Sequence, residues 1–495
     1  MTNLIDANSK KILSTKLSKH HPRRRTKIVV TLGPSLDDEV LLEKVIRLGA
    51  DVYRENFSHG PHEEHAKRIE NVRKLAKKVG REVAIFADLQ GPKIRIAKFK
   101  NKKIILKEND EFILDAELAK DAGDEISVGI DYKELPQDVA PEDTLLLDDG
   151  RIVLTVKKVE GAKIFTNVTT GGELSNNKGI NRRGGGLSAK AITQKDIDDI
   201  QFAASLDVDY FAISFPRSAE DIKEAKMLIK EANSKAGVIA KIERAEAIDH
   251  LDEIIEASDA VMIARGDLGV EIGDAELPAV QKKIIQRARA LDKPAITATQ
   301  MMESMIHNRI PTRAEVFDVA NAVLDNTDAV MLSAETATGD HPDVVVEAMS
   351  RICLGAEEQP LTKTSKHRLE CQFKAIDEAI AMATMYCANH VDIAAIICLT
   401  ESGATPRIMS RIRSGIPIFA LTRSLAAERK MNLYRGVYPI AFDVTKIPVD
   451  KINRTLIETL KHLNILQKDE LVIITRGDII GVCGHTNSMN IHKVE

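Results

Sequence analysis

The segment KIVVTLGPSLDDEVLLEKVIRLGADVYRENFS, residues 27–58, contains one complete strand–helix–strand unit. Both ends are apolar runs rich in β-branched residues, typical of buried strands, and the apolar residues between them recur at helical intervals of three and four. Eight such runs alternate with helical stretches up to about residue 358: KIVVTLG, DVYRENFS, VAIFADLQ, YFAISF, GVIAKIE, AVMIARG, PAITATQ and AVMLS. Eight units favour a (β/α)8 TIM barrel of the α/β class over a doubly wound open sheet, which rarely needs so many.

One connection in this pattern is far longer than a helix requires, because residues 91–209 separate VAIFADLQ from YFAISF. Within it, residues 92–187 contain short alternating runs with turn signals, which predict strands: KKIILKENDEFIL, TLLLDDGRIVLTVKKV and KIFTNVTTGG. We therefore expect a separate β-barrel-like lid domain at residues 92–187, inserted after the third barrel strand. The barrel then comprises residues 26–91 and 188–358, after an N-terminal extension at residues 1–25.

A smaller α/β domain is expected at residues 370–495, after the polar linker QPLTKTSKHRLE. The run AIDEAIAMATMYCANH has helical spacing, and four later apolar runs predict strands: AAIICLT, PIFALT, VYPIAF and LVIITRG.

Composition narrows the class of protein. The chain has 495 residues, of which 44% are hydrophobic and 29% charged, and a net charge of only −4, so no global field attracts nucleic acid or a membrane. Any anionic substrate must be held by local cations. The five cysteines are scattered and never form a C-x-x-C pair, and neither a signal peptide nor an apolar run of ~18 residues is present. We expect a cytoplasmic protein.

The ends of the predicted strands carry the candidate chemistry, because the active site of such a barrel lies at the C-terminal ends of its strands. The second strand carries Arg54, Asn56 and Ser58, and the fifth carries Lys241 and Glu243, in each case two residues apart and so on one face. Taken alone, the first group could be a surface arginine beside polar caps, and the second a structural ion pair.

Further groups follow the sixth and seventh strands. In MIARGDLGVEI, residues 262–272, two glycines permit a tight backbone that leaves Asp267 at a strand end, where it could share a divalent cation with Glu243. Thr299 adds a hydroxyl after the seventh strand, and Met301 and Met302 beyond it are expected to pack in the core. Acids, cations and a hydroxyl at several strand ends suit phosphoryl transfer.

Two other patterns need an interpretation. His59, His62 and His65 are spaced like metal ligands, but we expect them on the polar first turns of a helix that begins near Pro61. The stretch ADLQGPKIR, residues 87–95, concentrates cations directly after the third strand.

Seven long motifs, in this order, resemble those of the pyruvate kinase family: NFSHG (56–60), GPKIR (91–95), AKIERAEAI (240–248), ARGDLGVEI (264–272), ATQMMESM (298–305), PTRAEV (311–316) and DAVMLSAETA (328–337). The resemblance extends from residue 26 to the C-terminus. It implies transfer of a phosphoryl group from phosphoenolpyruvate to ADP, giving pyruvate and ATP. It also implies a homotetramer built from subunits with a barrel, a lid and a C-terminal regulatory domain.

The resemblance also implies roles for individual residues. Glu243 and Asp267 match ligands of a catalytic Mg²⁺, for which Mn²⁺ is a substitute. The catalytic and substrate-binding residues are Arg54, Lys241, Gly266, Asp267 and Thr299. The nucleotide contacts are Asn56, His59, Arg95 and Lys178.

Four positions match a monovalent-cation site of the family: Asn56, Ser58, Asp88 and Leu89. Many members have Thr at the position of Leu89 and Glu at the position of Lys93, and bind K⁺. The Lys93 ammonium could replace that ion, so K⁺ is not expected to be required. The alternative is that Lys93 points to solvent, as a lone lysine usually does.

The loop LTESGAT, residues 399–405, resembles the family's phosphate site for an allosteric activator, with Thr400, Ser402, Gly403, Ala404 and Thr405 as its residues. Hydroxyls and free amides at a helix start can bind an anion, although N-capping by Ser402 is an equal alternative. Members that respond to fructose 1,6-bisphosphate often have Lys where this chain has Glu401. We therefore expect activation by a sugar monophosphate or AMP.

Two other functions fit parts of the sequence. A carbon–carbon lyase would use a similar barrel and metal but needs no ADP site, so the lid and Arg95 argue against it. A catalytically silent sugar-phosphate sensor is disfavoured by the intact set of strand-end residues.

Overall fold

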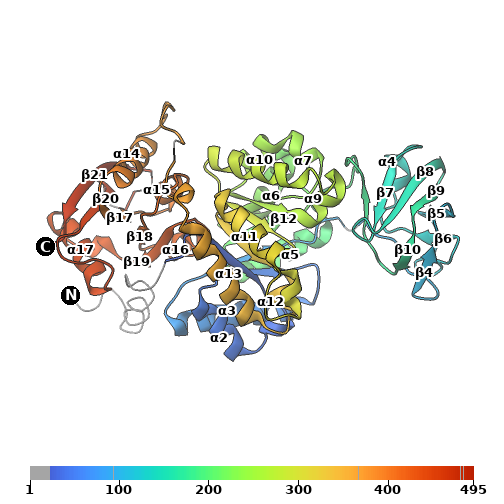
Figure 1. Cartoon of the computed structure of the whole chain (residues 1–495), viewed down its shortest axis with the longest axis horizontal. Coiled ribbons are helices and arrows are strands. Elements are labelled where there is room, and N and C mark those ends of the chain that lie inside the picture. The colour runs from blue at the N-terminus through green and yellow to red at the C-terminus, as the bar shows by residue number, and fades with distance from the viewer. Residues whose placement is uncertain (1–22, 93, 366, 480, 483) are drawn as a thin grey trace.

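The computed structural model describes residues 23–92, 94–365, 367–479, 481–482 and 484–495, so residues 1–22 of the expected N-terminal extension lie outside it. Eight parallel strands close into a barrel in which β1 pairs with both β2 and β16, as the sequence predicted (Figure 1). The strands are β1 (Lys27–Thr31), β2 (Val52–Asn56), β3 (Ala84–Asp88), β12 (Tyr210–Ile213), β13 (Gly237–Ile242), β14 (Ala260–Ala264), β15 (Ala295–Ala298) and β16 (Ala329–Leu332).

Helices cover the outside of the barrel, and short-range signals fix their ends. For the first of them, the Asp38 side chain accepts a hydrogen bond from the Val40 amide at 2.7 Å, and Gly49 ends the helix with a φ of 104°. The helices of this part are α2 (Glu39–Leu48), α3 (His62–Val79), α5 (Gln194–Ser205), α6 (Ala219–Glu231), α7 (Glu246–Asp249), α8 (Leu251–Ala257), α9 (Arg265–Ile272), α10 (Leu277–Ala290), α11 (Arg313–Leu324), α12 (Ala334–Ala337) and α13 (Pro342–Glu357).

Two small sheets follow β3 and form the lid. One is six-stranded, in the order β11-β7-β8-β9-β5-β6, and the other pairs β10 with β4. Alternate residues of these strands are buried in a core separate from that of the barrel. The elements are β4 (Lys103–Leu106), β5 (Glu111–Asp115), β6 (Ser127–Gly129), α4 (Leu135–Asp138), β7 (Thr144–Leu147), β8 (Ile152–Glu160), β9 (Lys163–Thr170), β10 (Gly172–Ser175) and β11 (Ile180–Arg182).

The C-terminal domain is a five-stranded sheet with helices, in the order β19-β18-β17-β20-β21. Four of its strands were predicted, but the antiparallel edge strand β21 was not, because TNSMNIHK lacks a continuous apolar run. The elements are α14 (Ile376–His390), β17 (Ile393–Leu399), α15 (Ala404–Ser410), β18 (Ile418–Thr422), α16 (Leu425–Met431), β19 (Val437–Ala441), α17 (Ile452–His462), β20 (Leu471–Gly477) and β21 (Thr486–Lys493).

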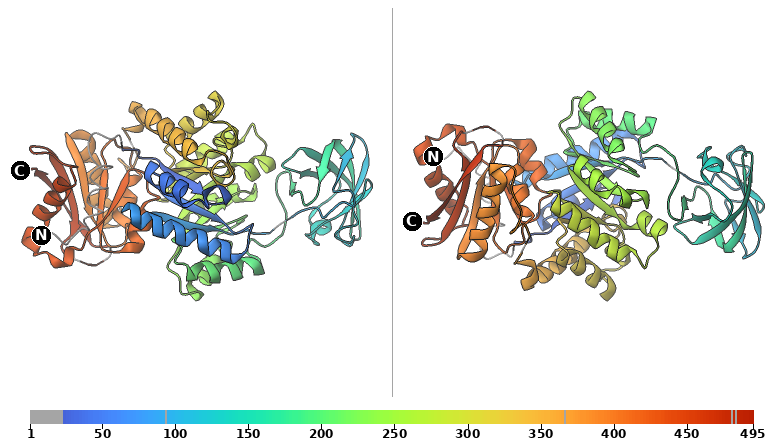
Figure 2. Two further views of the ribbon diagram at one scale, coloured as in Figure 1. Left: turned by 90° about the horizontal axis from the view of Figure 1, so that it is seen from below. Right: turned by 90° about the horizontal axis from the view of Figure 1, so that it is seen from above.

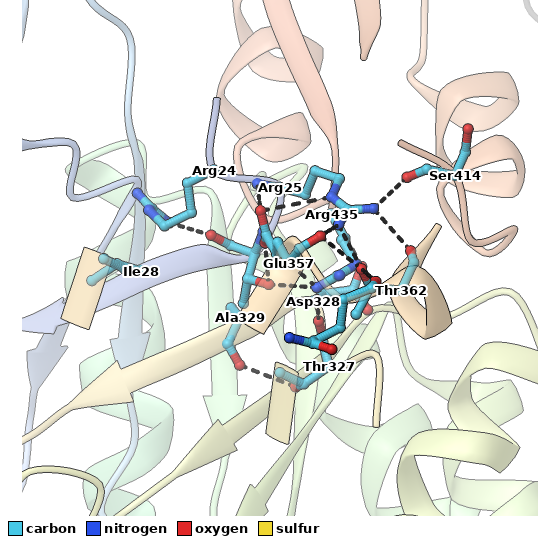
Figure 3. A network of polar contacts seen from close by, with 12 residues as sticks. Arg24, Arg25, Ile28, Thr327, Asp328, Ala329, Glu357, Thr362, Ser414 and Arg435 are labelled. Atoms are coloured by element: carbon cyan, nitrogen blue, oxygen red, sulfur yellow. Dashed lines mark hydrogen bonds and ion pairs between the residues drawn. The ribbon is translucent and has the colours of Figure 1, made fainter. Parts of the chain in front are cut away.

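The barrel lies between the lid and the C-terminal domain, and the views of Figure 2 agree on this order. A network of buried polar groups joins the barrel base to the C-terminal domain (Figure 3). Glu357, in the last turn of α13, accepts hydrogen bonds from the backbone amides of Arg25 and Thr26 at 2.8 and 2.6 Å. The Arg25 guanidinium in turn donates to the carbonyls of Thr362 and Ser414.

A second buried pair crosses the same junction. The Arg411 guanidinium, just after α15, forms a bidentate ion pair with Asp328, which precedes β16, and both side chains are only 2% exposed. Asp328 also accepts from the backbone amides of Ala295 at 2.9 Å and Arg435 at 3.0 Å. The carboxylate is therefore fully engaged, and its charge depends on Arg411 for compensation.

The expectations about membrane spans and cysteines concern features that the described residues show in part. No helix among them has the length and apolar character needed to cross a bilayer. Cys353, Cys371, Cys387 and Cys398 are free thiols, and the fifth cysteine lies outside the described part of the chain.

The Arg411–Asp328 pair yields a test of stability. We expect Arg411→Met to lower the free energy of unfolding by about 3–5 kcal/mol, because it leaves a buried carboxylate without its charged partner. The measurement is urea unfolding followed by circular dichroism. The control is Arg454→Met, which removes an arginine that is 80% exposed and paired with Glu458 on the same helix, and which should cost no more than about 0.5 kcal/mol. Equal effects of the two substitutions would contradict the prediction.

Candidate active site

A cavity of about 410 Å³ lies between the C-terminal ends of the barrel strands and the lid. The structure brings most of the predicted site residues together on its wall. They are Arg54, Asn56, Ser58, His59, Arg95, Lys178, Lys241, Glu243 and Asp267. Residues separated by more than 200 positions thus share one cavity, because parallel strands all deliver their C-terminal ends to the same rim.

The Lys241 ammonium is the centre of the charged network in this cavity. Its Nζ lies 3.1 Å from Asp88 Oδ1 and 2.9 Å from Glu243 Oε1, and it donates to Ser214 Oγ at 2.7 Å. The contact with Ser214 is a hydrogen bond, whereas the two carboxylate contacts are ion pairs, and Asp88 Oδ1 accepts no hydrogen bond. An anion that binds here competes with these carboxylates for the ammonium.

The charges in this network do not balance. Burial alone would lower the pKa of Lys241, but the carboxylates of Asp88 and Glu243 outweigh it and raise that pKa. For Asp88, the effect of burial is outweighed by Lys241 and then Arg54, which lower its pKa. Burial raises the pKa of Glu243 to about 7 against the opposing effect of Lys241, and the charge of Asp267 adds to the rise. Three carboxylates thus face two cations, and a further cation would favour ionised Glu243.

Two hydrogen bonds fix the Arg54 guanidinium at the edge of this network. Its Nε donates to Asp88 Oδ2 at 2.6 Å, and its Nη1 donates to Thr31 Oγ1 at 3.3 Å. Since a guanidinium has five N–H donors, donors remain for an anion in the cavity.

Asp267 lies in the first turn of α9, just beyond the end of β14, and the glycines expected to permit a tight backbone there are helical. The chain enters a helix directly after β14, and neither Gly266 nor Gly269 has a left-handed φ. Burial raises the pKa of Asp267, so a nearby cation would stabilise its charged form.

The donor set on the cavity wall fits a magnesium ion. Within the described residues, no three or more His, Cys, Asp or Glu side chains form a metal-binding group. Glu243 and Asp267 nevertheless both line the cavity and influence each other's charge. Mg²⁺ commonly takes one or two protein carboxylates and completes its shell with substrate phosphates and water.

Thr299 and Gly266 contact each other beside the cavity, although neither is among the residues that line it. Thr299 has a φ of 65°, which is costly for a β-branched residue. Arg265 stabilises this conformation, because its Nη2 donates to the Thr299 carbonyl at 2.6 Å. The Thr299 hydroxyl accepts from the Gly266 amide at 2.8 Å. Met301 and Met302 are fully buried, which confirms their predicted packing role.

The predicted monovalent-cation positions are already engaged by protein groups. Both oxygens of Asp88 face protein cations, and the Leu89 carbonyl accepts a hydrogen bond from Ser214 Oγ at 2.7 Å. Asn56 Oδ1 accepts from the Ser58 amide at 3.2 Å. The predicted role of Lys93 concerns a position outside the described residues.

The lid contributes positively and negatively charged side chains to the wall of the cavity. Lys178 Nζ lies 2.7 Å from Asp148 Oδ1, and Asp149 also lines the cavity. Asp148 and Asp149 both have left-handed φ values, of 49° and 56°. A backbone bond from the Gly184 amide to the Glu271 carbonyl, at 3.0 Å, joins the returning lid segment to α9.

The histidines do not form one site. His59 lines the cavity, while His65 is fully buried with its Nδ1 2.5 Å from Glu55 Oε1. The expectation that all three lie on a polar helix surface is therefore wrong for His65, because that side of α3 packs against β2.

Sequence reasoning missed three contributors to the site. Ser214 follows β12 directly and receives the Lys241 hydrogen bond, while Arg265 and Asp148 act as described above. The sequence signal that could have indicated Ser214 was its position directly after the fourth barrel strand, for which no functional residue had been predicted.

The predicted phosphate loop follows β17 and lines a second, much smaller cavity of about 40 Å³. The segment from the end of β20 to the start of β21 lines the same cavity with Gly477, Ile479, Gly481, Val482, Gly484, His485 and Thr486. Thr400 Oγ1 accepts from the Gly403 amide at 3.0 Å, and Ser402 Oγ accepts from the Ala404 amide at 3.4 Å. The N-cap residue of α15 is Gly403, with a φ of 80° and no side-chain cap. Ser402 is therefore not the N-cap residue, although its hydroxyl accepts from the first amide of α15.

Two side chains of this loop region are also engaged. Glu401 accepts from Arg423 Nε through both oxygens, at 3.1 and 3.0 Å. Thr405 Oγ1 lies 2.8 Å from Thr486 Oγ1, which joins the loop to β21.

Comparison with known proteins agrees with this geometry. Residues 23–346 match the family model "Pyruvate kinase, barrel domain", and residues 378–492 match "Pyruvate kinase, alpha/beta domain". The chain is 56% identical over 479 residues to pyruvate kinase II of Salmonella typhimurium, covering 95% of this chain and 99% of that protein. It is 55% identical over 458 residues to the pyruvate kinase of Haemophilus influenzae, covering 92% and 96%. The chain therefore belongs to the pyruvate kinase family of phosphotransferases.

Proposed function

We propose that this protein transfers the phosphoryl group of phosphoenolpyruvate to ADP, giving pyruvate and ATP, as the final step of glycolysis. The observation that carries the proposal is the Lys241 ammonium, held by Asp88, Glu243 and Ser214 in a cavity closed on one side by a lid. Such a preorganised charge stabilises negative charge as it develops, at no cost of reorganisation during the reaction.

Arg54 and Lys241 bind the phosphoryl oxygens of phosphoenolpyruvate in this proposal. The bond between phosphorus and the enol oxygen breaks, and a terminal oxygen of ADP forms the new bond. The electron pair stays on the enolate oxygen, where Lys241 offsets the charge. Asp88 keeps both cations oriented when substrate is absent, through contacts of 2.6 Å to Arg54 and 3.1 Å to Lys241.

Glu243 and Asp267 would hold Mg²⁺, or Mn²⁺ as a substitute, which supplies positive charge to substrate oxygens when bound. The amides at Gly266 and Asp267 and the Thr299 hydroxyl bind the substrate carboxylate. In this proposal Thr299 also passes a proton, through water, to the enolate carbon.

The lid provides the nucleotide side of the site. Arg95 and Lys178, with Asn56 and His59 from the barrel, contact the phosphates of ADP. The pairing of Lys178 with Asp148 keeps its charge at the cavity until a nucleotide phosphate competes for it.

An assay that follows pyruvate formation together with ADP consumption tests the proposal against the two rival functions. A lyase would form pyruvate without consuming ADP, and a silent sensor would do neither. We further propose the domain division given above, a cytoplasmic location and a homotetramer, for which light scattering of the intact protein gives the mass.

Activity without K⁺ is part of the proposal. In this chain the Asp88 carboxylate already has two protein cations, Arg54 and Lys241, as neighbours. The Leu89 carbonyl is occupied by Ser214. A monovalent ion would compete with these groups, and Lys93 would add like-charge repulsion.

The regulatory proposal concerns Thr400, Ser402, Gly403, Ala404 and Thr405. The cavity beside them has a volume of about 40 Å³, enough for one small polar group, and Glu401 lines it. We infer that it holds the single phosphate of a sugar monophosphate or AMP. A second phosphate would meet the Glu401 carboxylate, although Arg423 offsets part of that charge.

Lys241→Met should lower the turnover number by ~10²-fold or more, because it removes the charge that offsets the developing enolate. The measurement is initial rate at saturating phosphoenolpyruvate and ADP. Lys44→Met is the matched control, since Lys44 is an exposed lysine that is also paired with an aspartate. Melting curves establish that both variants are folded. Near-normal turnover in folded Lys241→Met would remove this residue from the mechanism.

Full activity is expected with Mg²⁺ in a Tris buffer without K⁺, and Lys93→Glu should create a K⁺ requirement, because it replaces a fixed cation with an acid. Rates with and without KCl test both statements. Lys100→Glu, an exposed lid lysine paired with Asp124, is the control for a general charge effect. Strong activation of the unmodified protein by K⁺ would show that Lys93 does not replace the ion.

A monophosphate should lower the phosphoenolpyruvate concentration needed for half-maximal rate, whereas fructose 1,6-bisphosphate should act weakly. Titration of each compound at low phosphoenolpyruvate measures this difference. Glu401→Lys should strengthen the response to the bisphosphate, since it converts repulsion to attraction, while Glu401→Gln should have a smaller effect. The inference is incorrect if the unmodified protein prefers the bisphosphate.

A further inference from the structure

A separate cavity of about 370 Å³ lies at the opposite end of the barrel from the active site, where the barrel base meets the C-terminal domain. Tyr210 and Gly237, at the first residues of β12 and β13, form part of its wall, together with the end of α6. Arg407 of α15 and Tyr434 line it from the C-terminal domain. Both domains therefore contribute side chains to one solvent-open cavity.

The wall of this cavity carries a large excess of positive charge. Its only carboxylate among the described lining residues is Asp259, which lies 3.3 Å from one of the lysines. The cations on the wall are Lys226, Lys230, Lys235, Arg407 and Lys430.

Most of these cations have no partner that would explain their position. Among the described residues, Lys226 pairs with Asp259, whereas Lys230, Lys235 and Arg407 form no ion pair. The Nε atom of Arg407 is buried and has no hydrogen-bond acceptor. A buried donor without an acceptor costs about 1–3 kcal/mol, so an acceptor in the cavity would be stabilising.

Lys430 supports the same conclusion from the other domain. Its Nζ donates to the Lys235 carbonyl at 2.6 Å, which fixes the ammonium at the junction of the two domains. Burial lowers its pKa, and a nearby anion would favour the charged form.

The volume and the aromatic wall indicate more than a simple ion. A phosphate alone would leave most of 370 Å³ unfilled, and this volume lies within the range of small-molecule sites. Tyr210 and Tyr434 are buried in the wall, and the Tyr210 hydroxyl donates to the Lys430 carbonyl at 3.0 Å. The loop cavity, at about 40 Å³, cannot hold a whole sugar phosphate or nucleotide.

We propose that this interdomain cavity is a binding site for a small phosphate-bearing metabolite, a nucleoside monophosphate or a sugar monophosphate, distinct from the active site and from the small cavity at the loop of residues 399–405. The phosphate contacts Arg407 and the lysines of α6 and the following loop. Ser402 lines both this cavity and the loop cavity, so the two sites are neighbours that share one residue.

Equilibrium dialysis of the full-length protein tests this proposal, with AMP, ribose 5-phosphate and orthophosphate as separate probes. Phosphoenolpyruvate and Mg²⁺ at saturation keep the probes out of the phosphoenolpyruvate site, and ADP is left out so that the substrate has no phosphoryl acceptor and is not consumed. We expect the double substitution Lys230→Gln/Lys235→Gln, and separately Arg407→Gln, to weaken binding of AMP or ribose 5-phosphate at least about tenfold, as loss of charged hydrogen bonds does. The two metabolite probes distinguish a nucleotide from a sugar phosphate.

Two control variants make the result decisive. Lys223→Gln removes a cation from the same helix α6 that pairs with Glu220 and does not line the cavity, and it should bind as the unmodified protein does. Thr405→Val alters only the loop cavity, and it should leave this binding in place. The proposal is overturned if the cavity variants bind all probes normally, if Thr405→Val alone abolishes binding, or if orthophosphate is the only probe that binds. Because binding is measured without turnover, this outcome is independent of the catalytic proposal.

Discussion

The Lys241 ammonium is the interaction on which the active-site rim depends. Two buried carboxylates lie there: Asp88 ends β3 and Glu243 follows β13, with β12 between these two strands. Neither could remain charged at low cost without a shared cation. Lys241 joins them and is itself fixed by Ser214. The same contacts that stabilise the rim also hold one positive charge at the position where a reacting anion would bind.

Buried charged side chains lie at both ends of the barrel, but their charges are compensated to different extents. At the base, Asp328 and Glu357 are saturated by backbone amides and arginines, so those groups join the domains and have little capacity for a ligand. At the rim, burial raises the pKa values of Asp267 and Glu243, and the surrounding positive charge is too small to offset it. Incomplete compensation is thus the physical feature that separates a site for chemistry from a structural junction.

Left-handed backbone conformations of non-glycine residues occur at the same rim, as they do elsewhere in the described chain. Thr299 has a left-handed φ and is held by Arg265, while Asp148 and Asp149 adopt the same region in the lid. Such conformations persist only where surrounding contacts determine them, and they place a hydroxyl and two carboxylates beside the cavity. A backbone bond from the Gly184 amide to the Glu271 carbonyl links the lid to the barrel, while the apolar cores of the two domains are separate.

The sequence by itself determined the barrel, the inserted lid sheets and the C-terminal α/β domain, because the apolar periodicity of each element is a local property of the chain. It also indicated Arg54, Lys241, Glu243 and Asp267, since strand ends of a barrel share one rim. Tertiary structure alone decided that Ser214 supports Lys241, that Arg265 holds Thr299 and that His65 is buried. These facts depend on contacts between distant segments, and a cavity shared by two domains has no periodicity in the sequence from which it could be inferred.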